Sequence, residues 1–134
     1  MCVLLMNYGM RLKTMTEPKV QILFAPAFVK AVKSLRKKYP HIRQDLEQLI
    51  KQLQNADLPG DRIQSTGYIV YKVRLSNRDA KRGKSGGYRV IYYLKTRKKT
   101  IFLTIYTKSE REDITTREIQ QIIETYPDDD DNTS

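Results

Sequence analysis

The first part of the chain combines one strand-like run with two helical patterns. Residues 20–24 place apolar side chains at alternating positions, which predicts a short β-strand, and proline follows at position 26, where the first turn of a helix tolerates it. Apolar residues then recur at helical spacings of three and four in two segments, Phe28, Val32 and Leu35 in the first and Ile42, Leu46, Leu49, Ile50 and Leu53 in the second. The first helix should end near Tyr39 and Pro40, because proline disfavours helical backbone in the residue before it. The pattern predicts a helical hairpin followed by a loop over residues 55–61.

The second part of the chain changes to strand patterns. Three strands are predicted, at residues 68–75, 88–94 and 101–106, joined by a polar glycine-containing loop at 76–87 and a basic turn at 95–99. In the first of these strands, Tyr71 and Val73 point to one face and Lys72 and Arg74 to the other. The three strands are expected to form an antiparallel meander.

A short helix is predicted at the end of this region. Thr115 and Glu118 have the spacing of a capping box, and an apolar stripe follows them. The expected order is therefore β-α-α-β-β-β-α, an α+β fold in which an antiparallel sheet is backed by a two-helix hairpin and followed by a short C-terminal helix.

Length and composition indicate one domain. The 134 residues divide into a variable N-terminal extension at 1–19, a folded domain at 20–126 and an acidic, disordered tail at 127–134. With Cys2 as the single cysteine and His41 as the single histidine, a disulfide framework, a thiolate zinc site and a two-histidine acid–base pair are excluded. No apolar run approaches the ~20 residues of a membrane span. We therefore expect a cytoplasmic protein with no membrane partner and no metal or other cofactor.

The charge of the chain is concentrated in the predicted meander. The formal net charge is +10, and the stretch from 69 to 108 carries a single acidic residue, Asp79. The basic residues of this stretch are Lys72, Arg74, Arg78, Lys81, Arg82, Lys84, Arg89, Lys95, Arg97, Lys98, Lys99 and Lys108. Six of the nine tyrosines lie between 68 and 108. Cations interleaved with aromatic rings suit phosphate contacts and base stacking, although a solvated sheet face with half-buried tyrosines would give the same composition.

A phosphate site can be built from this stretch. If the strand register aligns their faces, Lys72, Arg74 and Arg89 converge on one patch that could hold a scissile phosphate and stabilise charge developing on it. Attack by a ribose 2′-OH would also need a base, for which a crowded lysine or a tyrosine is the candidate. His41 follows a proline at a helix start, where a surface or capping role is expected.

Two segments carry a resemblance to a known family: the run Gly-Lys-Ser-Gly-Gly-Tyr-Arg-Val-Ile-Tyr-Tyr at 83–93 and the run from Ile101 to Ile114. They resemble the RelE/ParE superfamily of bacterial type II toxins, most closely its RelE/HigB branch, within a similarity that covers roughly 20–126. The resemblance implies a metal-free, ribosome-dependent mRNA endonuclease that cuts mRNA in the ribosomal A site by 2′-OH attack. It also implies a cognate antitoxin protein as partner.

The resemblance places catalytic residues on Lys72, Arg74, Arg89 and Lys108. The family has an arginine where this chain has Ser109, and a catalytic tyrosine where it has Thr115. Tyr93 or Tyr106 could substitute, or a lysine-rich loop could do the work, so the general acid and base stay open. Tyr93 is taken as the catalytic candidate, and the expected RNA-binding residues are Arg78, Lys81, Arg82, Lys84 and Tyr106.

Two other functions remain compatible with the sequence. One is a ParE-like inhibitor of DNA gyrase on the same fold, and the other is an RNA-binding module without catalysis. Intact mRNA during growth arrest would favour the first, and salt-sensitive RNA binding without cleavage would favour the second.

Overall fold

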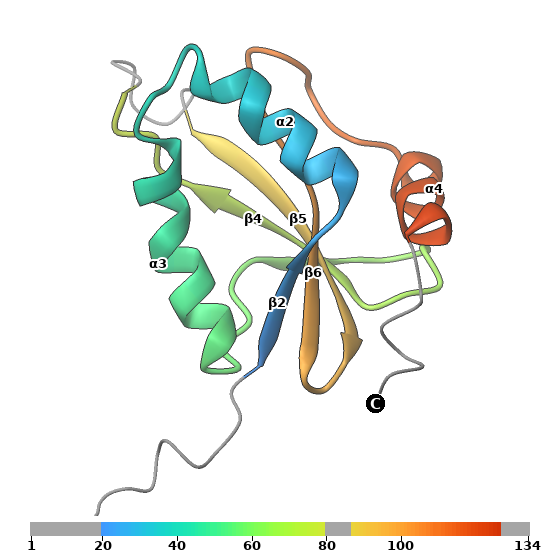
Figure 1. The fold of residues 1–134 in the computed structure, drawn as a ribbon. Helices are drawn as coiled ribbons and strands as arrows, with labels where there is room; N and C mark the ends of the chain where they lie inside the picture. Colours follow the sequence, from blue (N-terminus) through green and yellow to red (C-terminus); the bar gives the residue numbers. More distant parts are fainter. Residues whose placement is uncertain (1–19, 80–86, 127–134) are drawn as a thin grey trace, which may run out of the picture.

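The computed structural model describes residues 20–79 and 87–126, which form one five-stranded sheet with helices on both faces (Figure 1). The elements are β2 (Gln21–Phe24), α2 (Pro26–Arg36), α3 (Ile42–Gln54), β3 (Asp61–Ile63), β4 (Val70–Leu75), β5 (Tyr88–Thr96), β6 (Lys99–Thr107) and α4 (Thr116–Thr125). The strand order is β2-β6-β5-β4-β3. The predicted α+β class, the helical hairpin, the antiparallel meander of β4, β5 and β6 and the final helix are confirmed.

The sheet is larger than the predicted meander. The N-terminal strand β2 pairs with β6 in parallel, so the sheet is not antiparallel throughout. Its polypeptide continues into α2 through Ala25, whose N–H donates to the Phe102 carbonyl at 2.9 Å. The prediction of a loop up to residue 61 was wrong at its end, because Asp61 opens the short strand β3, which pairs antiparallel with β4. A three-residue strand is too short to show an alternating pattern, and only its pairing with β4 identifies it.

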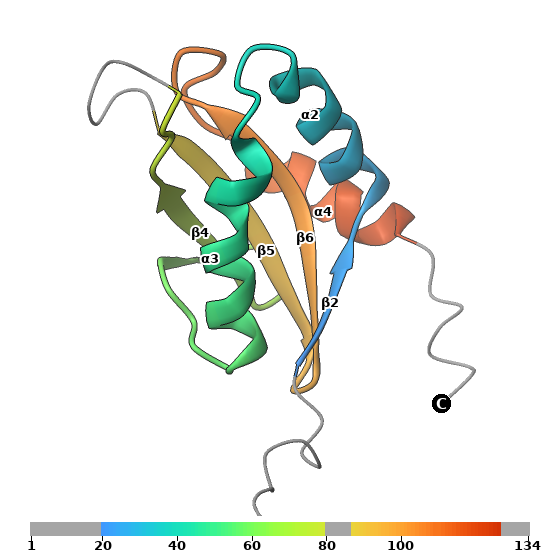
Figure 2. The same ribbon diagram turned by 60° about the vertical axis from the view of Figure 1, so that its left-hand side comes forward.

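Two apolar clusters lie on the two faces of the sheet. Figure 2 shows the helices that cover them, with α2 and α3 on one side of the sheet and α4 on the other. Phe28 of α2 and Leu49 of α3 pack with Val73 and Tyr92 on one face. Ile119 of α4 belongs to the cluster on the other face. The strand alternation therefore assigns each residue of β4 to the helical hairpin or to the face that carries α4.

Local signals fix the helix ends. The capping box is present, with the Glu118 N–H donating to the Thr115 hydroxyl at 3.1 Å and the Thr115 N–H donating to Glu118 Oε1 at 3.3 Å. The helix α2 ends at Arg36, and turn hydrogen bonds from Lys38 and Tyr39 to the Leu35 carbonyl lead into Pro40. The ends of these helices position the segments that carry the candidate site.

Several predictions concern residues outside the described ranges. They are the N-terminal extension at 1–19, the acidic tail at 127–134 and most of the glycine-containing loop, with Lys81, Arg82 and Lys84. Within residues 20–79 and 87–126, no helix is long and apolar enough to cross a membrane.

Candidate phosphate-binding site

The register between β4 and β5 brings three of the predicted basic residues to one face of the sheet. Arg74 lies directly opposite Arg89, and Lys72 lies directly opposite Ile91. Opposed residues of an antiparallel pair share a face, so Lys72, Arg74 and Arg89 form one cationic cluster on the face that carries α4. Like charges placed opposite one another repel, which favours an anion between them.

Arg89 occupies the most enclosed position of this cluster. It is 8% exposed and lies between Arg74 on β4 and Tyr106 on β6. No carboxylate in the described part of the chain forms an ion pair with it. A buried cation without a counter-ion is costly, and a phosphate oxygen is a chemically suitable partner for a planar guanidinium.

Asp113 connects the cluster to the segment before α4. Its Oδ1 accepts hydrogen bonds from the Ile114 N–H at 2.8 Å, the Tyr106 hydroxyl at 3.1 Å and Lys72 Nζ at 3.2 Å. The hydrogen bond from the Ile114 N–H, helped by those from Lys72 and Tyr106, holds the pKa of the Asp113 carboxyl below its usual range. Asp113 is therefore an anion held against Lys72 at one side of the cationic cluster.

Tyr106 keeps its proton at neutral pH. Burial of the phenol, together with its hydrogen bond to Asp113, raises the pKa of Tyr106 to about 12. The residue is 3% exposed, so the buried Tyr106 hydroxyl contacts an Asp113 carboxylate that itself reaches solvent. Its place at the Asp113 carboxylate makes it a donor that orients this group.

Arg111 is a cation two residues after Ser109, the position at which the family has an arginine. The Arg111 guanidinium carbon lies 5.5 Å from the centre of the Tyr106 ring. The guanidinium contacts both carboxylate oxygens of Glu118, at 2.6 and 3.2 Å, and its Nε donates to the Asp113 carbonyl at 3.0 Å. Arg111 thus fixes the backbone of Asp113, while the Ser109 hydroxyl lies 3.1 Å from that of Thr107.

Asp113 and Arg111 were not among the predicted site residues. Both lie in a mixed run of charges, Glu-Arg-Glu-Asp at 110–113, which has no spacing typical of a site. The available signal was indirect: this run links β6 to the capping box of α4. Such a link must cross the end of the sheet near Tyr106.

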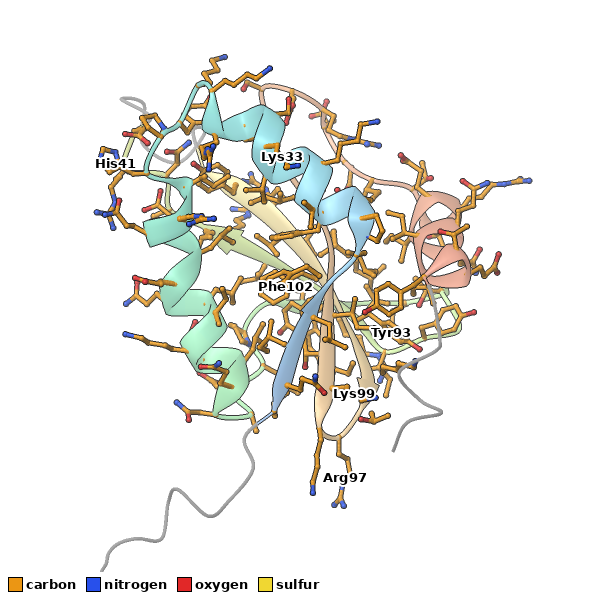
Figure 3. The ribbon with its side chains drawn as sticks, viewed as in Figure 1. Lys33, His41, Tyr93, Arg97, Lys99 and Phe102 are labelled. Atoms are coloured by element: carbon orange, nitrogen blue, oxygen red, sulfur yellow. The ribbon has the colours of Figure 1, made fainter. Side chains whose placement is uncertain are left out.

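Two other predicted residues lie outside the cluster. Tyr93 is on the same face as Arg89 but four residues further along β5, about 13 Å at the usual rise of a strand. It packs edge-to-face on Tyr68 at 5.5 Å, on the side of the molecule that carries α4 (Figure 3). Lys108 follows the last residue of β6 and is exposed.

Arg78 has a different setting from the one expected of an RNA contact. Its Nε donates to Asp45 Oδ1 at 2.9 Å, and its backbone N–H donates to Asp45 Oδ2 at 3.2 Å. Asp45 is a buried residue of α3. The arginine therefore ties the residues that follow β4 to the helical hairpin.

His41 makes a second tie at the same place. It occupies the N-cap position of α3 without capping the helix through its side chain. Its Nδ1 lies 2.7 Å from Asp79 Oδ1, and its N–H donates to Asp79 Oδ2 at 2.7 Å. This hydrogen bonding holds the pKa of Asp79 below its usual range. The exposed histidine is thus a surface residue, as expected, with a structural partner.

The Asp79 tie predicts a pH-dependent contribution to stability. The folded-state pKa of Asp79 is lowered, so its contribution to stability is fully present above the ordinary carboxyl pKa. This contribution is lost as the pH falls from the ordinary pKa through the lowered folded-state pKa. Asp79→Asn should therefore lower the melting temperature at pH 6, and the difference from wild type should shrink towards pH 3. Thermal unfolding followed by circular dichroism measures it, with exposed Asp61→Asn as the control. A difference that is constant with pH would contradict the assignment.

An apolar groove of about 440 Å³ lies between α2 and α3, on the other side of the sheet from the cationic cluster. Exposed Phe24 and Val29 are among the residues that line it. Because it lies on the opposite face of the sheet, it is separate from the candidate site. In the described part of the chain, no group of three or more His, Cys, Asp or Glu side chains could hold a metal ion.

A comparison with known families identifies the family of the chain. Residues 21–126, from β2 to the end of α4, match the family model described as the RelE toxin of the RelE/RelB toxin–antitoxin system. A search of curated proteins finds no match. The matched region contains Lys72, Arg74 and Arg89.

Proposed function

Since the chain belongs to the RelE family of toxins from toxin–antitoxin systems, we propose that it is a metal-free endoribonuclease that cleaves mRNA in the ribosomal A site. The observation that carries this proposal is the pairing of Arg74 with Arg89 on the sheet face that carries α4. Binding a protein target does not require two guanidinium groups directly opposite each other. A phosphate group does suit this arrangement.

The cluster can stabilise the charge that develops during cleavage. When a ribose 2′-OH attacks the adjacent phosphorus, negative charge grows on the non-bridging oxygens of the phosphorane. Arg89 and Arg74 would donate to these oxygens from fixed positions on paired strands, so little reorganisation is needed as the charge develops. Exposed Lys108 would bind the phosphate chain beside them. Lys81, Arg82 and Lys84 lie outside the described residues and stay predictions for contacts with RNA.

The tyrosine assignment changes with the geometry. Tyr106 lies opposite Arg89 and contacts Asp113, whereas Tyr93 lies about 13 Å along the strand. We therefore place Tyr106 rather than Tyr93 beside the reacting groups. This reverses the roles predicted from the sequence, in which Tyr93 was the catalytic candidate and Tyr106 an RNA contact.

The family implies an antitoxin partner. We propose that this antitoxin neutralises the protein by covering the cationic face with an acidic segment, because complementary charge would both guide and hold it there. With mRNA and the ribosome as the other partners, the proposed place of action is the cytoplasm.

A defined mRNA tests the proposed function. Purified protein should cleave the message at A-site codons only when ribosomes are present. A 2′-deoxy nucleotide at the cut position should prevent cleavage, because the attacking hydroxyl is missing. Intact mRNA together with gyrase-linked DNA breaks would instead favour the ParE-like alternative, and salt-sensitive RNA binding without cuts would favour the non-catalytic one.

A further inference from the structure

The carboxylate of Asp113 is half engaged. The hydrogen bonds that it accepts from Lys72, Tyr106 and Ile114 all end on Oδ1. Within residues 20–79 and 87–126, no donor contacts Oδ2. The Asp113 side chain is 59% exposed, so Oδ2 can be reached by a ligand on the cationic face.

The other candidate bases are less well placed. Lys72 forms an ion pair with Asp113 and so serves as a cation at this point. His41 bonds to Asp79 beside the helical hairpin. Tyr106 is buried and holds its proton, which leaves it no capacity as a base at neutral pH.

We propose that Asp113 is the general base of the cleavage reaction, accepting the 2′-OH proton on Oδ2, and that Tyr106 is a positioning residue that acts through Oδ1 of the same carboxylate. This assignment rests on the proposed function. It gives a role to an acidic residue beside a cluster of cations. It also supplies a base in a chain that has Thr115 where the family has a catalytic tyrosine.

The step balances with water as the only other reactant. Asp113 Oδ2 takes the proton of the 2′-OH as the O2′–phosphorus bond forms and the phosphorus–O5′ bond breaks. The departing O5′ takes a proton from water, and Asp113 then returns its proton to the resulting hydroxide. The products are a 2′,3′-cyclic phosphate and a 5′-hydroxyl end.

The groups around Asp113 favour its charged form. Lys72 faces it from β4, Tyr106 from β6 and Arg111 from its own segment, with Glu118 of α4 paired to that arginine. Arg89 on β5 lies on the same face, beside Tyr106. With Asp113 ionised and Tyr106 protonated, the single-turnover rate of the wild type should be constant between pH 6 and 8.5.

Single-turnover cleavage of ribosome-bound mRNA tests the assignment. Asp113→Asn keeps an oxygen that can accept the Oδ1 hydrogen bonds but cannot take the 2′-OH proton. We expect its rate to fall by about 10²- to 10⁴-fold and to rise about tenfold per pH unit, because hydroxide must then remove the proton. Tyr106→Phe should slow cleavage much less and keep the flat profile. Glu112→Gln, which removes the same charge one residue away, should match the wild type.

The outcomes separate this inference from the proposed function. If the wild type cuts and Asp113→Asn cuts equally fast, or more slowly but with a flat pH profile, Asp113 is not the base while the nuclease function stands. If the wild type makes no cuts on ribosomes, the proposed function fails first. Melting curves of each variant establish that the loss is chemical rather than a loss of fold.

Discussion

Arg89→Ala is expected to reduce mRNA cleavage by about 10²- to 10³-fold, the usual loss when a preorganised donor to a developing charge is removed. Arg89 is 8% exposed and held between Arg74 and Tyr106, so its guanidinium is fixed before substrate arrives. The variant should no longer arrest growth when expressed. Cleavage mapping after a short induction, wild type beside variant, measures the effect.

The chain offers a matched control for this experiment. Arg97 lies in the turn between β5 and β6, at the far end of β5 from Arg89 (Figure 3). Arg97→Ala removes the same charge at a position away from the cluster. If the position of Arg89 rather than the net charge matters, this variant should keep the wild-type pattern of cuts. Arg89→Lys keeps the charge but loses the planar arrangement of donors, and it should recover only part of the activity. Wild-type cleavage by a folded Arg89→Ala protein would remove Arg89 from the mechanism.

Stability should respond to Arg89 in the opposite direction from activity. The arginine is buried, faces a like charge and has no carboxylate partner in the described part of the chain. Replacing such a cation by an apolar side chain of similar length is often neutral or stabilising. Arg89→Met should therefore melt no earlier than the wild type while it loses cleavage, which distinguishes a functional cation from a structural one.

The sequence was informative wherever a repeating pattern determined the outcome. The alternation in residues 70–75 was enough to place Lys72 and Arg74 on one face, since strand geometry leaves no other choice. The spacing of Thr115 and Glu118 was enough to locate the start of α4. Both signals are local, and local signals depend little on the rest of the fold.

Features that depend on distant pairing could not be predicted. The contact of Asp113 with Lys72 joins residues 41 positions apart, and no local pattern encodes that distance. Tyr93 and Tyr106 are equivalent by composition, and only the β5–β6 register places Tyr106 beside Arg89. Arg78 is one basic residue among many in its stretch, and its bond to buried Asp45 requires the helical hairpin to be in place.

Gly60→Ala should be the most destabilising single-methyl change near the site, at about 3 kcal/mol or more. Gly60 has φ of +97°, a conformation that side chains disfavour. A Cβ at this position would clash with the carbonyl oxygen of Lys72 and lie 2.9 Å from Val73 Cβ. Because the obstacle is the backbone of β4, relief requires β3 or β4 to move. For a domain of this size, the melting temperature should fall by about 15 °C.

Gly67→Ala separates the two causes of this effect. Gly67 also has a positive φ, +83°, but a Cβ there would meet nothing within 4 Å. That variant should lose only about 1 kcal/mol from the backbone conformation. Equal melting temperatures for the two variants would contradict the close approach of Gly60 to β4. Because the clash falls on Lys72 itself, Gly60→Ala should also weaken the contact of Lys72 with Asp113 and slow cleavage below the melting transition, whereas Gly67→Ala should cleave normally.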